Sequence, residues 1–404
     1  MDMADDEHRL AARSREARIR VVMLIPTFTL GGGGAERLAI AIATNLPPER
    51  YEAWICTTGT PGDNSLAVAL RDTGVRHVDL ARSGTLDLLA ARRLIGFLRR
   101  KRIDVLHAHQ FGSNLWGTVI GRLCRVPVVI AHEHSWSYVG QPLRRLLDRM
   151  VISRYADTFV AVSTADRDRM ISIEHVKPAK IRVITTAYLP RASIDRGDLR
   201  AELGIGADVP VVGTVAILRP QKAIDVLLDA FSRLPDRLSH ARLVIAGDGR
   251  SRGALEAHAT ELGLRERVHF VGIRDDVDAV WRAFDVGAIS SDFEGTPIAA
   301  IEAMTNGVAL AATAVGGVPE LLENDVSSLL VAPRDPAALA AALTRLLDDP
   351  VLRARLAGEA KVISDSFSLT RLMKSTEDMY LELLSDARRG STSPAAVAAA
   401  TRSA

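Results

Sequence analysis

The chain alternates short apolar runs with helical patterns, and this rhythm limits the possible folds more than any other feature. The first apolar run, 19–25, ends at Pro26, is followed by a loop of four glycines, and leads into a helical stretch at 35–46. Alternation of strands with helices predicts a parallel sheet covered on both faces. The further strands expected in this series are 51–57, 105–108, 126–131, 158–162 and 181–184.

A second series of apolar runs repeats the pattern, so we expect two doubly wound α/β domains. Its strands are expected at 209–215, 242–246, 268–271, 286–289, 308–312 and 328–331. Segment 189–207 is rich in charge and glycine and is predicted to be the linker. The domains would face each other across a cleft, with ligands beyond the carboxyl ends of the strands. The expected domain plan is 19–188, 208–368 and a helix at 369–385 that returns to the first domain, with a flexible leader at 1–18 and a disordered tail at 390–404.

The bulk composition excludes several classes of protein. With 51 basic and 49 acidic residues, the net charge of +2 argues against a dedicated nucleic-acid binder. Cys56 and Cys124 form no disulfide framework and no zinc-ligand spacing. The charged N-terminal segment lacks the apolar core of a secretory signal, and no apolar run reaches the roughly 18 residues that span a bilayer. We therefore expect a cytoplasmic protein whose only membrane contact is peripheral, at the inner face.

Two glutamates eight residues apart, Glu294 and Glu302, follow the strand expected at 286–289. Between them lies a turn whose proline is placed to open a helix. Backbone N–H groups at a helix start suit phosphate, and the two carboxylates could hold sugar hydroxyls and ribose hydroxyls. The ligand-binding residues predicted from this stretch are Glu294, Gly295, Thr296, Pro297, Ile298 and Glu302.

These residues resemble the EX7E motif of glycosyltransferase family 4, whose members are retaining enzymes with the GT-B fold. The Phe-Glu-Gly-x-Pro context and the following Gly-Gly-Val-Pro-Glu at 316–320 make the resemblance specific, and it covers about residues 19–385. Gly33, Gly34 and Glu36 are similar to the family's GGxE loop, where glycine backbone approaches the donor phosphates and the acceptor. Gly247 lies in a strand and glycine turn similar to the family's donor side, and 271–276 resembles its base-holding loop.

The family usually carries an arginine and a lysine that neutralise the departing diphosphate. Lys222 matches the lysine, but Ile217 occupies the arginine position and Arg219 lies two residues later. In an extended segment the side chains of residues 217 and 219 point the same way, whereas in a turn that argument fails. Positive charge is needed where the leaving group develops negative charge. We expect no metal and no other cofactor, because no Asp-x-Asp stands in a suitable context.

Two pairs of histidines end neighbouring strands of the first domain: His107 with His109, and His132 with His134. Family members carry a histidine after the second of these strands, within reach of the transferred sugar. His132 and His134 are both candidates, and we favour His134 as the catalytic one. His109 and His132, with Glu36, are then expected on the acceptor side. Zinc is the rival interpretation, since four histidines at paired spacing can bind metal, although the resemblance explains their placement without one.

The resemblance implies transfer of a sugar from a nucleotide diphosphate-sugar donor to a hydroxyl acceptor, with retention at the anomeric carbon. Glu294 would bind the sugar and Glu302 the ribose. Lys222 and Arg219 would stabilise the diphosphate, and His134 would orient the sugar, so His134, Glu294 and Lys222 are the catalytic candidates. The alternatives are a non-catalytic nucleotide-sugar-binding subunit, favoured by the missing arginine at 217, and a GT-B nucleotide-sugar epimerase.

The acceptor is the least defined partner; a glycan, a lipid-linked molecule or a small molecule would each supply the hydroxyl. Basic residues gather on helical stretches of the first domain, some of them beside leucines and a methionine. A basic amphipathic helix can lie on an anionic membrane, which would suit a lipid-linked acceptor; the alternative is an ordinary solvated helix face. The residues are Arg92, Arg93, Arg99, Arg100, Lys101, Arg102, Arg144, Arg145 and Arg149.

Overall fold

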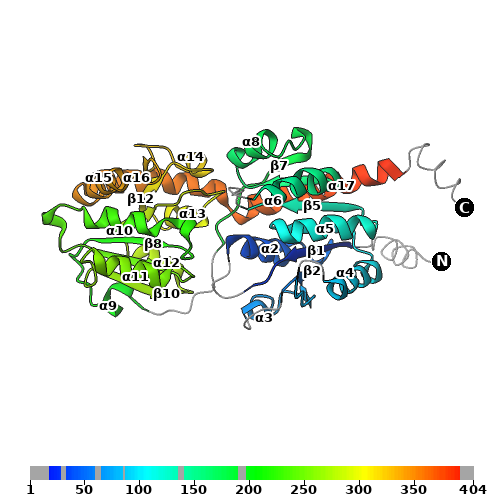
Figure 1. Cartoon of the computed structure of the whole chain (residues 1–404), viewed down its shortest axis with the longest axis horizontal. Coiled ribbons are helices and arrows are strands. Elements are labelled where there is room, and N and C mark those ends of the chain that lie inside the picture. Colours follow the sequence, from blue (N-terminus) through cyan, green and yellow to red (C-terminus); the bar gives the residue numbers. More distant parts are fainter. Residues whose placement is uncertain are drawn as a thin grey trace, which may run out of the picture.

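The computed structural model describes residues 18–28, 33–59, 65–84, 87–134, 141–189 and 197–391. The predicted leader up to residue 17 and the predicted tail from residue 392 lie outside this part of the chain. Two α/β domains, each built on a parallel sheet, lie end to end along the long axis of the molecule (Figure 1). The predicted architecture of two doubly wound domains is confirmed.

The first sheet has the strand order β3-β2-β1-β4-β5-β6-β7, with every pair parallel. Its strands are β1 (Ile19–Ile25), β2 (Tyr51–Thr57), β3 (Arg76–Asp79), β4 (Val105–His109), β5 (Val128–His132), β6 (Thr158–Ala161) and β7 (Ile181–Val183). The helices are α2 (Gly34–Asn45), α3 (Ser65–Ala69), α4 (Leu88–Lys101), α5 (Phe111–Leu123), α6 (Pro142–Leu147), η1 (Asp148–Ile152), α7 (Ser153–Tyr155), α8 (Thr164–Ser172) and η2 (Pro178–Lys180).

The second sheet has the order β10-β9-β8-β11-β12-β13, also parallel throughout. Its strands are β8 (Val211–Val215), β9 (Arg242–Ala246), β10 (Val268–Gly272), β11 (Val286–Ile289), β12 (Ala309–Thr313) and β13 (Leu329–Val331). The helices are α9 (Leu199–Glu202), η3 (Pro220–Lys222), α10 (Ile224–Ser232), η4 (Asp236–Leu238), α11 (Arg252–Glu261), α12 (Val277–Arg282), α13 (Ile298–Thr305), α14 (Val318–Leu321), α15 (Pro336–Asp348), α16 (Pro350–Ser364), η5 (Asp365–Phe367) and α17 (Leu369–Ser391).

Two predicted strands begin two residues later than expected, and a proline explains each of these shifts. The strand predicted at 126–131 is β5, which begins after Pro127, and the one predicted at 209–215 is β8, which begins after Pro210. Proline has no N–H to donate to a sheet, so it marks the edge of each ladder. β3 was not predicted, because its four residues are mostly exposed and lack an apolar run.

The segment predicted as the linker divides between the two domains. Leu189 is buried in the first core, with the interior faces of β1 and β5. Asp198 caps α9 by accepting from the Arg200 N–H, and Leu199 and Ile205 then pack into the second core. Residues 197–207 therefore belong with the second domain.

The last helix, α17, leaves the second domain and runs along the first (Figure 1). Its buried side chains Leu372, Met373, Met379, Tyr380 and Leu384 join the core that includes β1, β4 and β5. The helix continues to Ser391, beyond the position at which the tail was predicted to begin. Within the described residues, no helix combines the length and apolar character needed to cross a bilayer.

The strand order of each sheet reverses at its centre. In the first sheet, β2 and β3 follow β1 toward one edge, whereas the strands from β4 onward proceed toward the other edge. In the second sheet the same reversal lies between β8 and β11. A crevice opens beyond the carboxyl ends of the strands at such a switch point, and ligands bind there. The loops after β1, β4, β8 and β11 are therefore where a site is expected.

Candidate functional site

A cavity of about 850 Å³ lies between the domains and takes its walls from the loops at both switch points. The first domain contributes the start of α2, the start of α5 and the residues after β5. The second contributes the loop after β8, the turn after β9, and the stretch between β11 and the end of α13. Most of the predicted site residues thus come together in one place, although they are spread over more than two hundred positions of sequence.

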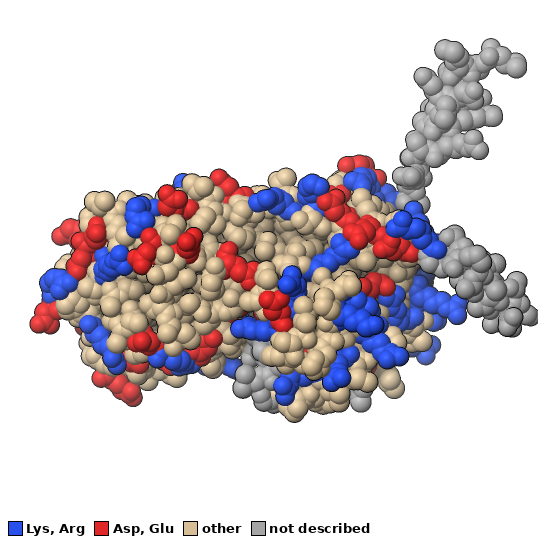
Figure 2. All heavy atoms as spheres, turned by 90° about the horizontal axis from the view of Figure 1, so that it is seen from above, with Lys and Arg blue, Asp and Glu red and all other residues tan. Residues whose placement is uncertain are grey.

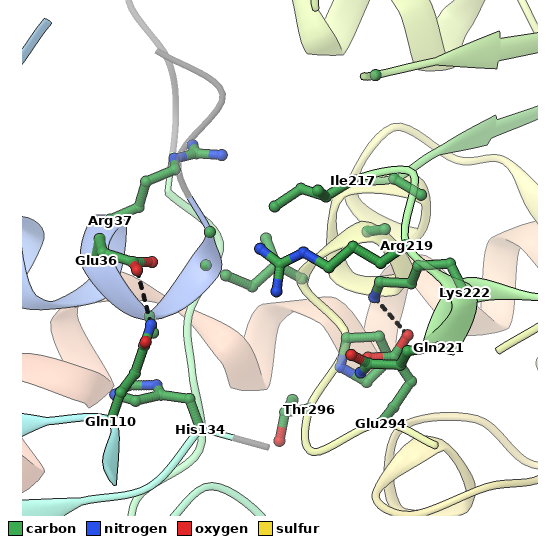
Figure 3. Close-up of a pocket in the computed structure, with 18 of the residues that line it drawn as sticks. Glu36, Arg37, Gln110, His134, Ile217, Arg219, Gln221, Lys222, Glu294 and Thr296 are labelled. Carbon is green, nitrogen blue, oxygen red and sulfur yellow. Dashed lines mark hydrogen bonds and ion pairs between the residues drawn. The ribbon is translucent and has the colours of Figure 1, made fainter. Parts of the chain in front are cut away.

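Glu294 and Lys222 form an ion pair on the second-domain wall (Figure 3). The Lys222 Nζ lies 2.6 Å from Glu294 Oε1, which also accepts from the Ser291 hydroxyl at 2.6 Å. The Gln221 amide donates to the Phe293 carbonyl at 3.1 Å and ties η3 to the same loop. The pair is therefore held in place before any ligand arrives, with a cation and a carboxylate side by side at the cavity edge.

Glycines beneath Glu294 fix the backbone of this loop. Gly316 has φ of +54°, and a Cβ there would lie 1.7 Å from the Glu294 carbonyl oxygen. A Cβ on Gly317 would meet the Gly295 carbonyl at 2.2 Å, and one on Gly295 would meet the His134 carbonyl at 2.5 Å. The Gly-Gly of 316–317 is required because three backbone segments pass one another at distances that exclude a side chain.

Glu302 is buried on α13 and its carboxylate joins the domains. It accepts from the Trp281 indole N–H at 3.4 Å and forms an ion pair of 3.6 Å with Arg37 on α2. Arg37 also donates to the Leu189 carbonyl at 3.3 Å, at the point where the first domain ends. Arg37 was not singled out from the sequence, although it follows Glu36 directly.

Arg219 and Ile217 both line the cavity, but the reason is not strand alternation. β8 ends at Val215, and the Arg219 N–H bonds the Ile217 carbonyl at 2.8 Å, which makes a tight turn. Of the two alternatives for this segment, the structure therefore shows the turn. Leu218 at the turn's centre is fully buried, so its two neighbours face outward, and the Arg219 guanidinium reaches across the cavity toward the first domain (Figure 3).

The residues beside Glu294 that are predicted to bind the donor have distinct positions. Thr296, Pro297 and Ile298 line the cavity, and the Thr296 hydroxyl donates to the Val162 carbonyl of the first domain at 2.5 Å. Gly247 lines it as well, with φ of +134°; a Cβ there would lie 1.9 Å from the Ala216 carbonyl oxygen. Gly295 belongs to the packed backbone described above and is not among the lining residues.

On the opposite wall, Gly33, Gly34 and Glu36 line the cavity at the start of α2. A Cβ on Gly34 would lie 2.5 Å from the Ile298 side chain, so this glycine permits close approach of the two domains. The Gln110 amide donates to Glu36 Oε1 at 2.7 Å (Figure 3). Gln110 stands at the end of β4 with a strained φ of 67°, a feature that its sequence does not reveal.

The four histidines form a ladder of stacked rings on β4 and β5. Rings at neighbouring positions stack with centroids 4.2–5.2 Å apart. His109 Nδ1 lies 2.9 Å from His134 Nε2, and His107 bridges His132 at 3.1 Å and the Tyr380 hydroxyl of α17 at 2.7 Å. Burial lowers the pKa of His107 and His134 to about 3, so the ladder is neutral at physiological pH.

Only His134 of the ladder lines the cavity. His109 and His132, expected on the acceptor side, are fully buried and lie behind it. The physical reason is the pleat: alternate residues of β4 and β5 project to the face that α17 covers, and the strands extend to His109 and His132 before the chain turns. Neither of these two lines the cavity, and their predicted place on the acceptor side stays a prediction.

The ladder also bears on the zinc alternative. Ring nitrogens of His107, His109 and His132 lie within 4.8 Å of one another. Their rings are stacked, however, and a tetrahedral zinc site needs rings that converge on one point. His107 Nε2 and Nδ1 are also engaged with His132 and Tyr380. The rings form a hydrogen-bonded ladder, and the expectation that the protein needs no metal stays a prediction.

Glu133 and Arg144 also line the first-domain wall, and nothing in the sequence indicates that they pair. The Glu133 side chain is 4 % exposed and lies 3.2 Å from the Arg144 Nη2. The Arg144 guanidinium also lies 4.7 Å from the centre of the ring of Phe111, the first residue of α5.

On the second-domain wall, Arg274 lies in the loop that resembles the family's base-holding loop. Its guanidinium forms ion pairs with Asp276 at 2.7 Å and with Glu202 at 2.8 Å.

Comparison with protein families covers both domains. The family model of glycosyltransferase family 4 matches residues 32–188, and that of glycosyl transferases group 1 matches residues 195–362. The first match contains the glycine loop and the histidines, and the second contains both glutamates.

Similar proteins span most of the chain. A D-inositol 3-phosphate glycosyltransferase of Actinosynnema mirum is 31 % identical over 299 residues, 69 % of this chain and 72 % of the relative. A UDP-Gal:alpha-D-GlcNAc-diphosphoundecaprenol alpha-1,3-galactosyltransferase of Escherichia coli is 24 % identical over 92 % of this chain and 99 % of its own. Anabaena HepE, solved with UDP-glucose, superposes with a TM-score of 0.76 over 91 % of this chain and all of that one, at 24 % identity.

Proposed function

Because the chain belongs to glycosyltransferase family 4 and has the GT-B fold, we propose that it is a retaining enzyme that transfers a sugar from a nucleotide diphosphate-sugar to a hydroxyl acceptor. The observation that carries this proposal is the preformed Lys222–Glu294 pair at the edge of the interdomain cavity. Lys222 would supply the positive charge for the leaving phosphate, and Glu294 would bind the sugar hydroxyls. The two groups lie 2.6 Å apart, just before the start of α13.

The cations of the second domain would stabilise the departing diphosphate. Lys222 and Arg219 lie on the cavity wall, and the α13 N-terminus opens toward it at Ile298. As the bond between the anomeric carbon and the phosphate oxygen breaks, negative charge develops on that oxygen, and preorganised positive groups lower the barrier. These groups take the place that a metal ion holds in other enzymes, so we propose that transfer needs no metal.

Retention requires the acceptor oxygen to form its bond on the face that the diphosphate leaves. In the proposed reaction the acceptor hydroxyl attacks the anomeric carbon and its proton passes to the leaving phosphate oxygen. His134 is neutral and lies on the first-domain wall, where it would hydrogen-bond and orient the sugar. Glu294 would hold sugar hydroxyls and Glu302 the ribose hydroxyls.

Exclusion of water is the second requirement, because hydrolysis competes with transfer. The domains already touch beside the cavity. The Glu320 carboxylate accepts from the Thr164 and Ala165 N–H groups at 2.8 and 2.7 Å, and Thr296 bonds Val162. These contacts link α14 of the second domain to the start of α8 in the first, close to the loop of Glu294.

For the acceptor, we propose a lipid-linked molecule reached at an anionic membrane surface, from the cytoplasmic side. Basic side chains gather over the first domain on the face shown in Figure 2. On α6 and η1, Leu143, Leu146 and Met150 are 67 %, 54 % and 52 % exposed, next to Arg145 and Arg149. The Escherichia coli relative, by its name, acts on a lipid-linked diphosphate.

The test is a donor panel assayed for transfer, hydrolysis and epimerisation. Purified protein would be incubated with UDP-, GDP- and ADP-sugars with and without candidate acceptors, and the anomeric configuration of the product read by NMR. The same assays on Glu294→Gln should show turnover lowered by about a hundredfold, whereas Glu359→Gln, an exposed glutamate of α16, should match the wild type.

Each rival function has its own outcome. Donor binding without any turnover would favour a non-catalytic subunit, and an epimerised donor without acceptor would favour an epimerase. A product with inverted configuration would refute the retaining mechanism while leaving the enzyme class intact. Activity that disappears with a chelator and returns with a divalent cation would refute metal independence.

A further inference from the structure

Six arginine and lysine side chains line the interdomain cavity within the described part of the chain, and four of them already face a carboxylate. The ion pairs are Arg37 with Glu302, Arg144 with Glu133, Lys222 with Glu294, and Arg274 with Asp276 and Glu202. The other two cations are Arg219 and Arg250, whose side chains form no ion pair and no hydrogen bond with any described residue. The second-domain wall therefore presents two positive charges that nothing in this part of the chain neutralises.

Arg219 and Arg250 stand on adjacent turns of the second domain. Arg219 follows Leu218 in the turn after β8, and Arg250 lies in the turn after β9. The Leu218 N–H donates to the Asp248 carbonyl at 2.9 Å, and the Leu218 carbonyl accepts from the Ser251 N–H at 3.0 Å. These two backbone bonds hold the turns together on either side of Arg250, so both arginines arise from one small area of the wall.

Two glycines allow the turns to lie against each other. A Cβ on Gly247 would lie 1.9 Å from the Ala216 carbonyl oxygen, and one on Gly249 would lie 2.4 Å from the Leu218 carbonyl oxygen. Both distances are too short for a side chain, so close approach of the two backbones requires glycine at these positions. The place of Arg250, directly after the second glycine, is thus determined by the packing of the backbone.

The carboxylates of the cavity that pair with none of its six cations are also engaged. Asp248 accepts from the next backbone N–H at 2.6 Å, and its other oxygen forms an ion pair of 3.1 Å with Arg252. Glu36 lies on the opposite wall, where a side-chain amide donates to it at 2.7 Å. Neither carboxylate forms an ion pair with Arg250.

A diphosphate supplies the negative charge that the two arginines lack. In a nucleotide diphosphate-sugar each phosphate carries one negative charge, so the charges of the diphosphate and of the two guanidinium groups balance. A guanidinium fork matches phosphate oxygens with parallel hydrogen bonds, which are stronger than bonds between neutral groups. Lys222 shares its charge with Glu294, so it does not balance a diphosphate by itself. Closing a cavity over charges is costly unless opposite charges compensate.

The order of the strands places the arginines beside the residue proposed to hold the sugar. β9, β8 and β11 are neighbours in the second sheet. Arg250 follows the first of these strands, Arg219 the second and Glu294 the third. The two cations therefore continue in a row from the carboxylate, as the diphosphate continues from the sugar in the donor.

We propose that Arg250 binds the donor diphosphate together with Arg219 and is thus a second phosphate-binding arginine of this wall. The inference rests on the proposed transferase function and deepens it, because it assigns a further residue to donor recognition. It also gives the turn that contains Ile217 the second positive charge that this turn does not supply by itself.

The test uses inorganic pyrophosphate, which carries the diphosphate without a base or a sugar. Its binding to the full chain would be followed by calorimetry for the wild type, Arg250→Gln and the matched control Arg265→Gln. Arg265 is an exposed arginine of the same domain and is not among the residues that line the cavity. Arg250→Gln should weaken binding by roughly tenfold to a hundredfold, because charge-assisted hydrogen bonds are lost. Arg265→Gln should match the wild type.

Two further variants separate phosphate binding from a structural role. Arg250→Lys keeps the charge without the fork, so it should recover part of the lost affinity. In a double-mutant cycle with Arg219→Gln, the two losses should be coupled, since both groups act on one ligand. Added salt should lower the affinity of the wild type more than that of Arg250→Gln, because screening acts on the charge that the variant lacks.

The proposal is overturned by unchanged pyrophosphate affinity in Arg250→Gln, by an equal loss in Arg265→Gln, or by a wild type that does not bind pyrophosphate. Strictly additive losses in the double variant would overturn joint binding by the two arginines. Failure of the proposed function gives a different result, because it would appear as absent turnover in the donor panel while pyrophosphate binding still depended on Arg250.

Discussion

The histidine ladder makes the first domain sensitive to acid, and the size of the effect follows from its burial. His107, His109 and His132 are buried in the folded protein and His134 is partly buried, and desolvation is the first cause that lowers each of their pKa values. In the unfolded chain they titrate near 6.5. The unfolded state therefore binds more protons below that pH, so stability is complete above it and is lost as the pH falls.

The loss can be estimated for a fall from about pH 7.5 to about pH 5.5. Each histidine that stays neutral in the folded state costs about 1.4 kcal/mol over that interval, so the four histidines of the ladder together cost about 5.5 kcal/mol. Asp166 opposes it, because burial raises the pKa of this carboxyl to about 6, and the folded state then gains a proton as the pH falls. Its offset is about 1 kcal/mol. The remaining loss is comparable with the whole stability of an ordinary domain, about 5–15 kcal/mol.

Urea unfolding at several pH values checks this estimate. In a Trp281→Phe background every tryptophan lies before residue 189, so fluorescence follows the first domain. His132→Gln should reduce the loss by about 1 kcal/mol, whereas His240→Gln, at an exposed position, should leave it unchanged. A free energy of unfolding that stays constant from pH 7.5 to pH 5.5, or rises, would refute the reasoning.

Three further predictions concern the donor side. Glu302→Ala should weaken nucleotide-sugar binding by about 2 kcal/mol, the value of charge-assisted bonds to hydroxyls, and equal affinity in calorimetry would refute that role. Gly316→Ala should lower the unfolding free energy by about 2 to 3 kcal/mol, since its Cβ displaces the Glu294 carbonyl, and an unshifted urea midpoint would contradict it. Lys222→Ala and Arg219→Ala should each lower kcat by about a hundredfold, and a normal rate in Arg219→Ala would show that Lys222 suffices.

The sequence predicted the fold because apolar runs and helix signals agree along most of the chain. Pro336 after Asp335 and Pro350 after Asp349 mark helix starts that the structure shows, each with the aspartate as cap. The miss at β3 has a physical cause: an exposed edge strand of four residues is stabilised by its neighbour, through pairs such as Trp54 with Arg76, and not by its own composition.

The donor half of the site was also accessible from sequence, because one continuous stretch supplies Glu294, the helix start and Glu302. The residues of the first-domain wall were harder to predict from the sequence. Arg37, Gln110 and the Glu133–Arg144 pair acquire their positions from contacts between distant elements. The histidines show the limit most clearly: spacing placed four of them near one edge, whereas the ends of β4 and β5 and the face on which each ring lies determine that His134 reaches the cavity.

This asymmetry between the halves bears on specificity. The donor half is built from closely packed backbone, where a Cβ at Gly247, Gly316 or Gly317 would collide with a carbonyl oxygen, so its geometry tolerates little change. The first-domain wall includes side chains at the starts of α5 and α6, where Phe111 and Arg144 can be exchanged without moving the backbone. Family members can therefore share donor chemistry while differing in acceptor, and the identity of this enzyme's acceptor should be sought in the residues around the first turn of α5.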